Sequence, residues 1–159
     1  MAKEIERKYL VDNGIWSPGG KGLTIRQGFI PVSGHTAVRI RITGKEAYLT
    51  IKGPSNGPER SEFEYSIPLS DAETMLEELC ERPLIDKIRY QVEFSGNTWE
   101  VDVFHGENEG LIIAEIELKM PDQQITLPAW VLKEVTDDPR YFNVNLTKHP
   151  YKSWKHAPS

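Results

Sequence analysis

Charged side chains alternate with other residues near the amino terminus, where Glu4, Glu6 and Lys8 occupy every second position of a strand-like segment. Successive side chains of a strand point to opposite faces, so these three share one face, about 6 to 7 Å apart. Two carboxylates at that distance repel each other by about 2 kcal/mol at an effective dielectric constant near 20. A bound cation would relieve this repulsion, and a metal ion is the natural candidate. An isolated Glu-x-Glu-x-Lys is also common on solvated strands and helices, so its meaning depends on whether it recurs.

The same alternation does recur along the chain. Further segments that place charged residues on one parity and apolar residues on the other cover 38–42, 49–52, 62–65, 87–90, 100–103 and 115–119. One interpretation of this pattern is a sheet face that is exposed to solvent and carries many salt bridges. However, the charged parity is nearly all ionic and rich in arginine, whereas solvated strand faces usually mix in Thr, Gln and Ser. The residue types therefore favour a polar lumen inside a barrel, with the apolar parity facing outward.

The predicted elements fit such a barrel. Strands are predicted over 1–11, 24–32, 37–43, 47–52, 60–68, 86–94, 98–104 and 111–120. Helices are predicted from Ser70, which with Glu73 matches a capping box, to Arg82, and from Pro128 to Val135. Many strands and few helices indicate a mainly β fold, a closed or nearly closed antiparallel barrel with a few flanking helices. No linker divides the chain, so one domain spanning 1–159 is expected.

The bulk composition narrows the function. A chain of 159 residues with 38% hydrophobic residues suits one domain, and its net charge of −5 argues against general electrostatic binding to nucleic acid. The charged amino terminus and the lack of a long apolar run predict no signal peptide, no membrane association and a cytoplasmic location. Cys80 is the only cysteine, which excludes an internal disulfide and a multi-cysteine zinc site. We expect it to be a buried structural thiol.

The charged lumen predicts what it binds. The basic residues would hold anionic oxygens, with arginine forks suited to phosphate; they are Lys8, Arg39, Arg41, Lys52, Lys87 and Arg89. The acidic residues would hold a hard divalent cation, Mg²⁺ or Mn²⁺; they are Glu4, Glu6, Glu62, Glu64, Asp102, Glu115 and Glu117. A ligand that satisfies both sets is polyanionic and chelates magnesium itself. A chain of phosphates has this chemistry.

Taken in chain order, these acidic and basic residues resemble the motifs of the CYTH superfamily, also called triphosphate tunnel metalloenzymes, in its short bacterial type. The resemblance spans the chain and implies an eight-stranded antiparallel tunnel, with triphosphate along its axis and a divalent metal needed for cleavage. It also implies a possible homodimer. We further count Arg26 among the expected substrate-binding residues. Members of the family include inorganic tripolyphosphatases, thiamine triphosphatases, class IV adenylate cyclases and a triphosphatase subunit of messenger-RNA capping.

We predict metal-dependent hydrolysis of inorganic tripolyphosphate to pyrophosphate and phosphate. Lys87 would lie closest to the scissile phosphate, and Glu4 would act as general base or help to hold a second cation. The rivals are enzymes acting on thiamine triphosphate or a nucleoside triphosphate, or cyclising ATP; these must recognise a ring, and only Tyr48 and Phe104 offer aromatic groups on the charged parity. A non-catalytic polyphosphate or nucleotide sensor is the alternative from another class, but it would gain little from so many carboxylates.

Two further features bear on selectivity. Phe29 stands where several short relatives carry tyrosine, so a hydroxyl that might restrain Lys87 is missing. A freer lysine could reach different phosphates and shift the preferred substrate. The carboxy-terminal tail could close one mouth of the tunnel or remain solvated, and its candidate residues are Lys148, Lys152, Trp154 and Lys155.

Overall fold

The computed structural model describes residues 3–54 and 56–154. Its strands are β1 (Lys3–Val11), β2 (Leu23–Ile30), β3 (Ala37–Thr43), β4 (Glu46–Lys52), β5 (Glu59–Ile67), β6 (Ile85–Phe94), β7 (Asn97–His105), β8 (Ile112–Glu117) and β9 (Val131–Glu134). Its helices are α1 (Leu69–Glu78) and α2 (Asn143–Lys148), with short 3-10 helices η1 (Gly106–Asn108), η2 (Pro139–Tyr141) and η3 (Tyr151–Ser153). None of the helices in these described ranges is both long enough and apolar enough to pass through a membrane.

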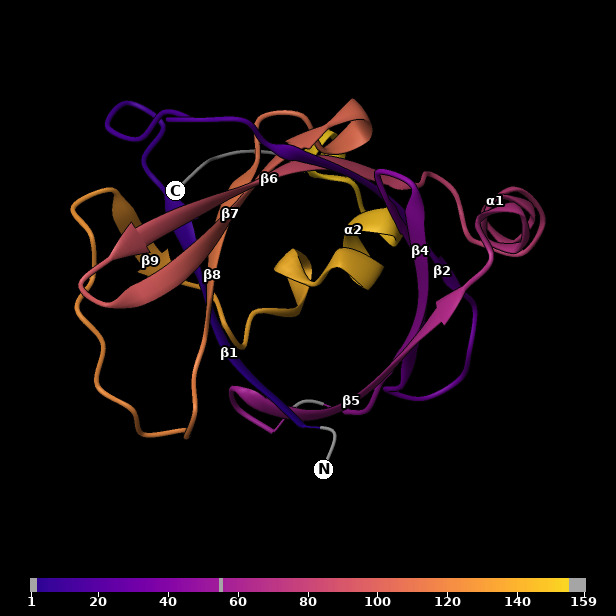
Figure 1. Cartoon of the computed structure of the whole chain (residues 1–159), viewed down its shortest axis with the longest axis horizontal. Helices are drawn as coiled ribbons and strands as arrows, with labels where there is room; N and C mark the ends of the chain where they lie inside the picture. The colour runs from indigo at the N-terminus through magenta and orange to yellow at the C-terminus, as the bar shows by residue number, and fades with distance from the viewer. Residues whose placement is uncertain (1–2, 55, 155–159) are drawn as a thin grey trace.

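Eight of the strands form a closed antiparallel barrel (Figure 1). Neighbouring strands are hydrogen bonded in the order β5-β4-β3-β2-β6-β7-β8-β1. β1 closes the ring because its two edges pair with different strands: Lys3–Ile5 pair with β5 on one edge, and Glu6–Leu10 pair with β8 on the other. The predicted eight-stranded antiparallel barrel is confirmed.

The helix predicted over 128–135 is wrong, because this segment contains the short strand β9. Past the point where β5 leaves β1, the edge of β1 is open, and β9 pairs there through Tyr9 and Val11. The backbone N–H of Val135 donates to the carbonyl of Lys8 at 2.8 Å, which extends this pairing. Pairing with an open strand edge therefore outweighs the local helix signal of Pro128.

The capping box predicted at Ser70 is also wrong. α1 begins one residue earlier, at Leu69, with Pro68 at the N-cap and no side-chain capping hydrogen bond. The backbone N–H of Ala72 donates to the carbonyl of Pro68 at 3.0 Å, so the first turn already starts at the proline. Ser70 consequently lies inside the first turn, where its carbonyl accepts a hydrogen bond from the Thr74 hydroxyl.

Apolar side chains on the outer face of the barrel form two clusters. On one side, Ala72 and Leu76 of α1 pack against Ile40 of β3, and Figure 1 shows the helix lying outside the strands. On another side, Trp99 of β7 contacts Trp130 of the segment before β9, with ring centroids 5.8 Å apart. The apolar parity therefore faces outward, as predicted, and is covered there by helix and connecting segments.

Cys80 is buried where the chain leaves α1, which agrees with the prediction of a structural thiol. The neighbouring strand β2 carries Gly28 at this point. A Cβ atom at Gly28 would stand 2.8 Å from the Cβ of Cys80 and 2.7 Å from Cδ2 of Leu84. Glycine therefore permits the close approach of this segment to the barrel.

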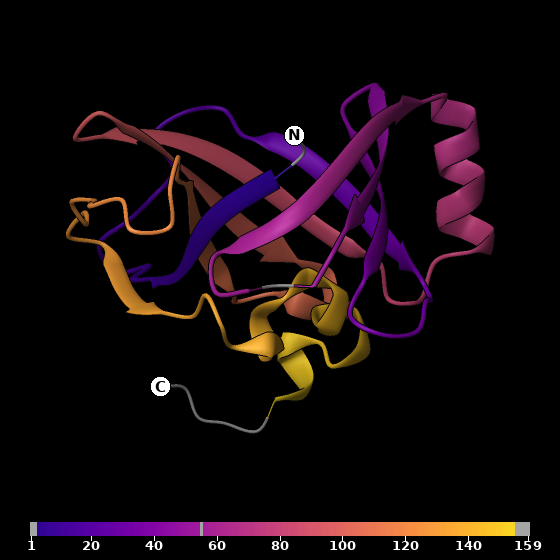
Figure 2. The same cartoon turned by 90° about the horizontal axis from the view of Figure 1, so that it is seen from below.

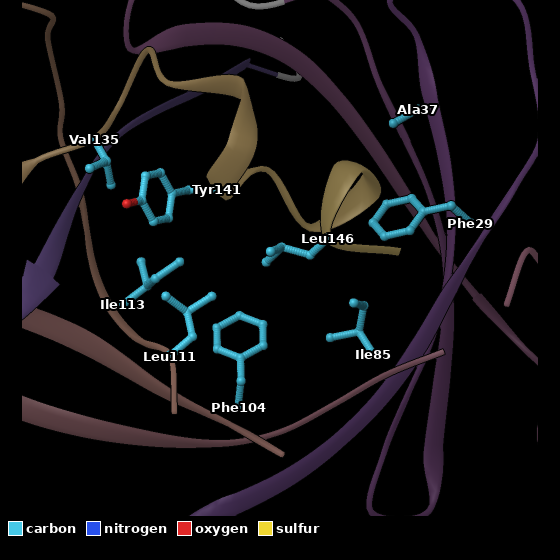
Figure 3. Close-up of a cluster of buried hydrophobic side chains, with 9 residues drawn as sticks. All are labelled: Phe29, Ala37, Ile85, Phe104, Leu111, Ile113, Val135, Tyr141 and Leu146. Atoms are coloured by element: carbon cyan, nitrogen blue, oxygen red, sulfur yellow. The ribbon is translucent and has the colours of Figure 1, made fainter. Parts of the chain in front are cut away.

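A third cluster, which we call the plug, fills one end of the barrel from the inside. Leu146 of α2 is fully buried and lies among Phe29, Ile85 and Phe104 of the strands (Figure 3). Figure 2 shows the carboxy-terminal elements gathered at this end of the barrel. Ile85 is two residues from Lys87 and so shares its face of β6. The inward parity is thus apolar at the plug and charged beyond it, a division that the alternation alone did not predict.

Candidate active site

A cavity of about 1100 Å³ lies in the barrel beside the plug. Every predicted site residue except Arg26 and Asp102 lines it: Glu4, Glu6, Lys8, Arg39, Arg41, Lys52, Glu62, Glu64, Lys87, Arg89, Glu115 and Glu117. They come from six different strands, and the alternation of each strand turns them inward. The barrel thereby brings together residues that are more than 100 positions apart in the sequence.

Arg26 does not join this set. It is exposed, whereas its neighbours Ile25 and Gln27 on β2 are buried. Because side chains alternate along the strand, Arg26 points away from the lumen when Ile25 and Gln27 point into the barrel. The expectation that Arg26 binds substrate therefore does not fit the structure.

Lys87 lies at the inner end of the cavity, against the plug. Its Nζ is 2.8 Å from Oδ2 of Asp102, donates to Oδ1 of Asn143 at 2.8 Å, and lies 5.4 Å from the ring centroid of Phe104. Its side chain is only 1% exposed. Burial disfavours the charged ammonium and lowers the pKa of Lys87 to about 7, although Asp102 opposes this shift.

Asp102 was expected to bind metal, and in the structure both of its carboxylate oxygens contact basic side chains. Arg89 donates to both carboxylate oxygens, from Nε at 2.7 Å and from an NH2 group at 2.9 Å, and Lys87 shares one of them. The carboxylate is 1% exposed and does not line the cavity. Burial alone would raise its pKa, but Arg89 and Lys87 hold the pKa of Asp102 well below its usual range. With its oxygens engaged in this way, Asp102 is placed to orient the two cations.

The arginines of β3 carry positive charge that the protein only partly neutralises. Arg39 lies 3.5 Å from Glu64 and donates to the Thr50 hydroxyl at 3.1 Å. Arg41 donates through Nε to Oε1 of Gln27 at 2.7 Å, and no carboxylate of the described ranges lies within ion-pair distance of it. Burial lowers the pKa of Arg41 to about 9, and the nearby arginines add to the shift. An anion bound here would relieve an existing electrostatic cost.

Other basic residues of the lumen pair with carboxylates. The Lys52 ammonium lies 2.9 Å from Oε1 of Glu4 and 3.8 Å from Oε2 of Glu62. Lys8 lies 3.6 Å from Glu115, its direct neighbour across the β1 and β8 pair. These lysines face the cavity while they hold the acids, so they are placed to contact an anion as well.

Like charges meet at Glu6 and Glu117, which are directly opposite each other on β1 and β8. Burial and a hydrogen bond with Glu4 raise the pKa of Glu6, and burial together with Glu6 raises the pKa of Glu117. Directly opposed like charges destabilise a sheet, and a cation between them would remove this cost. Within residues 3–54 and 56–154, no group of three or more His, Cys, Asp or Glu side chains is arranged to hold a metal ion. This donor set fits a magnesium-like ion that takes a few carboxylates and completes its shell with water and phosphate oxygens.

The effect expected of Phe29 is not seen in the geometry. Phe29 lies in the plug against Leu146, while Asn143 and Asp102 both hold the Lys87 ammonium. Lys87 is therefore held by two partners without a tyrosine hydroxyl, and the shift in substrate preference expected of Phe29 stays a prediction.

Among the polar residues of the site that were missed from the predicted set are Arg60, Glu100 and Asn143, which line the cavity, and Gln27, which bonds to Asn143 and Arg41 behind it. Gln27 shares the inward parity of β2, Arg60 that of Glu62 on β5, and Glu100 that of Asp102 on β7, so the alternation could have found these three. Asn143 belongs to α2, outside the alternating segments. Its contact with Lys87 spans 56 positions and left no signal in the sequence.

The tail contributes in part as expected. Lys148 and Lys152 are both exposed, and of the two Lys148 lines the cavity. Trp154 packs edge-on against Tyr141, with ring centroids 5.2 Å apart, and so secures the carboxy-terminal segment to the plug. Lys155 lies outside the described residues.

Known proteins share this sequence and architecture. The CYTH domain family model matches residues 2–151. The chain is 50% identical over 155 residues to an inorganic triphosphatase of Acetivibrio thermocellus, covering 98% of this chain and 99% of the relative. It is 34% identical over 149 residues to an inorganic triphosphatase of Nitrosomonas europaea, covering 90% and 95%. The crystal structure of the inorganic triphosphatase NE1496 superposes with a TM-score of 0.66 at 33% identity, covering 92% and 95%. The chain belongs to the CYTH domain family.

Proposed function

We propose that this protein hydrolyses inorganic tripolyphosphate to pyrophosphate and phosphate inside its barrel. The observation that carries the proposal is a cavity inside the barrel in which buried cations without a full set of counter-ions share the space with opposed carboxylates. A linear triphosphate with a bound divalent metal satisfies both groups at once. The two inorganic triphosphatases, similar over nearly the full length of this chain, support the same substrate.

The carboxylates would hold the metal, Mg²⁺ or Mn²⁺. Glu6 and Glu117 are the principal candidates because they oppose each other across two strands, and Glu4 lies beside Glu6. When bound, the metal would act as a Lewis acid toward phosphate oxygens and neutralise their charge. Asp102 is omitted from this set because its oxygens are held by Arg89 and Lys87.

The basic residues would orient the triphosphate and stabilise charge during cleavage. Arg39 and Arg41 present guanidinium groups from β3, and Lys87 and Arg89 lie together on β6 beside Asp102. Protonated Lys87 would stabilise the charge that develops at the scissile phosphate. Glu4 would take the proton of the attacking water once Lys52, its present partner, turns to the substrate.

The same cavity offers little for an organic ring, which disfavours thiamine triphosphate and nucleotides. Phe104 is buried in the plug, and Tyr48 is not among the residues that line the cavity. Phe29 and Phe142 do line it, but Phe29 packs in the plug, and the Phe142 ring already lies beneath the Lys8 ammonium, 5.4 Å from the centroid. Inorganic triphosphate needs no such ring contact.

Phosphate release from tripolyphosphate with Mg²⁺ or Mn²⁺ tests the proposal. Glu6→Gln removes one lumen carboxylate, whereas Glu73→Gln removes an exposed carboxylate of α1 and serves as the matched control. We expect Glu6→Gln to lose most activity and Glu73→Gln to retain it. Tight tripolyphosphate binding without turnover under either metal would instead favour a sensor. The homodimer, the cytoplasmic location, the single domain over 1–159 and the absence of nucleic-acid partners stay predictions.

A further inference from the structure

Asn143, the first residue of α2, forms a hydrogen-bond junction between the carboxy-terminal segment and the cations of the lumen. Its Oδ1 accepts from Nζ of Lys87 and from Nε2 of Gln27, each at 2.8 Å. Gln27 in turn accepts from Nε of Arg41 at 2.7 Å. One amide of the carboxy-terminal segment thus connects cations on β6 and β3.

The charged groups at its two ends fix the donor and the acceptor of each hydrogen bond in this chain. A lysine ammonium and an arginine guanidinium can only donate hydrogen bonds. Asn143 must therefore turn its oxygen toward Lys87, and Gln27 must turn its oxygen toward Arg41 and its NH2 group toward Asn143. Gln27 is fully buried, so its amide cannot exchange its partners for bulk water without opening this part of the barrel, whereas Asn143 is half-buried and borders the cavity.

The position of Asn143 is set by the packing around it. Leu146 of the same helix is buried in the plug, and Phe142, the preceding residue, lies beneath the Lys8 ammonium. The Asn143 amide is therefore held between the plug and the cavity. Within residues 3–54 and 56–154 it is the one neutral hydrogen-bond partner of the Lys87 ammonium, whose other close polar partner is the carboxylate of Asp102.

We propose that Asn143 is a positioning residue that holds the Lys87 ammonium in its working orientation and so makes catalysis depend on docking of the carboxy-terminal segment. This inference rests on the proposed function, in which Lys87 acts on the scissile phosphate. Asn143 acts through Lys87, because its amide oxygen is already taken up by Lys87 and Gln27.

Asn143→Leu tests this role by removing the acceptor at similar volume. We expect kcat on tripolyphosphate to fall roughly tenfold or more, the size expected for losing a hydrogen bond to a charged group, with KM changed less than about threefold. Asn143→Asp keeps an acceptor and should recover most of the rate. Thr147→Val is the matched control on α2, since the buried Thr147 hydroxyl finds no partner within the described ranges, and it should match the wild type.

A double-mutant cycle separates positioning from general support of the fold. Lys87→Met removes the group that Asn143 holds, so Asn143→Leu should add little further loss in kcat when combined with it. Losses that multiply, or an Asn143→Asp enzyme as slow as Asn143→Leu, would overturn the inference.

A readout without turnover keeps this test independent of the substrate. The ¹⁵Nζ NMR signal of Lys87, assigned by its loss in Lys87→Met, should shift in Asn143→Leu and stay in place in Thr147→Val. An unmoved signal in Asn143→Leu would refute the positioning role. A wild type that cleaves no tripolyphosphate while the signal moves would refute the proposed substrate and leave the Asn143 contact established.

Discussion

Asp102→Asn removes the negative charge that two buried cations share, while it nearly preserves side-chain shape. In the wild type, Asp102 contacts Arg89 at 2.7 and 2.9 Å and Lys87 at 2.8 Å, and its side chain is 1% exposed. Breaking a buried ion pair by removing one partner costs about 3 to 5 kcal/mol. Lys87 can release its proton because burial has lowered its pKa to about 7, whereas Arg89 cannot escape its charge so readily. We therefore expect a loss near the lower limit, about 3 kcal/mol.

Urea and thermal unfolding at pH 7 measure this loss. For a domain of this size, about 3 kcal/mol corresponds to a fall of about 6 to 12 °C in Tm. Asp86→Asn is the matched control, because Asp86 is an exposed carboxylate of β6, and it should change stability by no more than about 0.5 kcal/mol. If Asp102→Asn proved no more destabilising than Asp86→Asn, the reasoning about a shared buried counter-ion would be refuted.

Three further predictions concern the lumen and the plug. The folded-state pKa of Lys87 is about 7 against a usual 10.5, so between these pH values the unfolded chain binds more protons than the folded one. The free energy of unfolding of the wild type, measured in urea, should therefore rise with pH through this window, and that of Lys87→Met should rise less. An equal rise in both proteins would contradict the low pKa. Because Glu6 faces Glu117, Mg²⁺ or Mn²⁺ with tripolyphosphate should raise the Tm of the wild type more than that of Glu6→Gln in a thermal-shift assay; equal shifts would argue against Glu6 as a ligand. Leu146→Ala should lower the free energy of unfolding by about 2 to 5 kcal/mol in urea titrations, and a loss below about 1 kcal/mol would show that the plug packs loosely.

Alternation along single strands was enough to predict the barrel and most of its lumen. The rule that side chains alternate faces is local, and Glu6, Arg39 and Lys87 obey it because closure turns one parity of every strand inward. The same rule would have placed Arg26 outside, since Arg26 and Gln27 cannot both face the lumen.

Features that depend on contacts between distant segments could not be predicted. Val131 belongs to β9 because an edge of β1 lies open, and nothing near Val131 in the sequence reports that edge. Likewise, the parity does not say that α2 enters one end of the barrel and makes the inward positions of Ile85 and Phe104 apolar. Asp102 was predicted as a ligand by residue type alone, whereas its partners Arg89 and Lys87 decide its role.

A time course of tripolyphosphate hydrolysis followed by ³¹P NMR tests the central claim most directly, that this lumen cleaves an inorganic triphosphate. With Mg²⁺ or Mn²⁺, we predict that pyrophosphate and phosphate appear in equal amounts, and that ATP and thiamine triphosphate supplied at the same concentration are cleaved more slowly. Faster cleavage of either organic triphosphate, or no products with either metal, would contradict it.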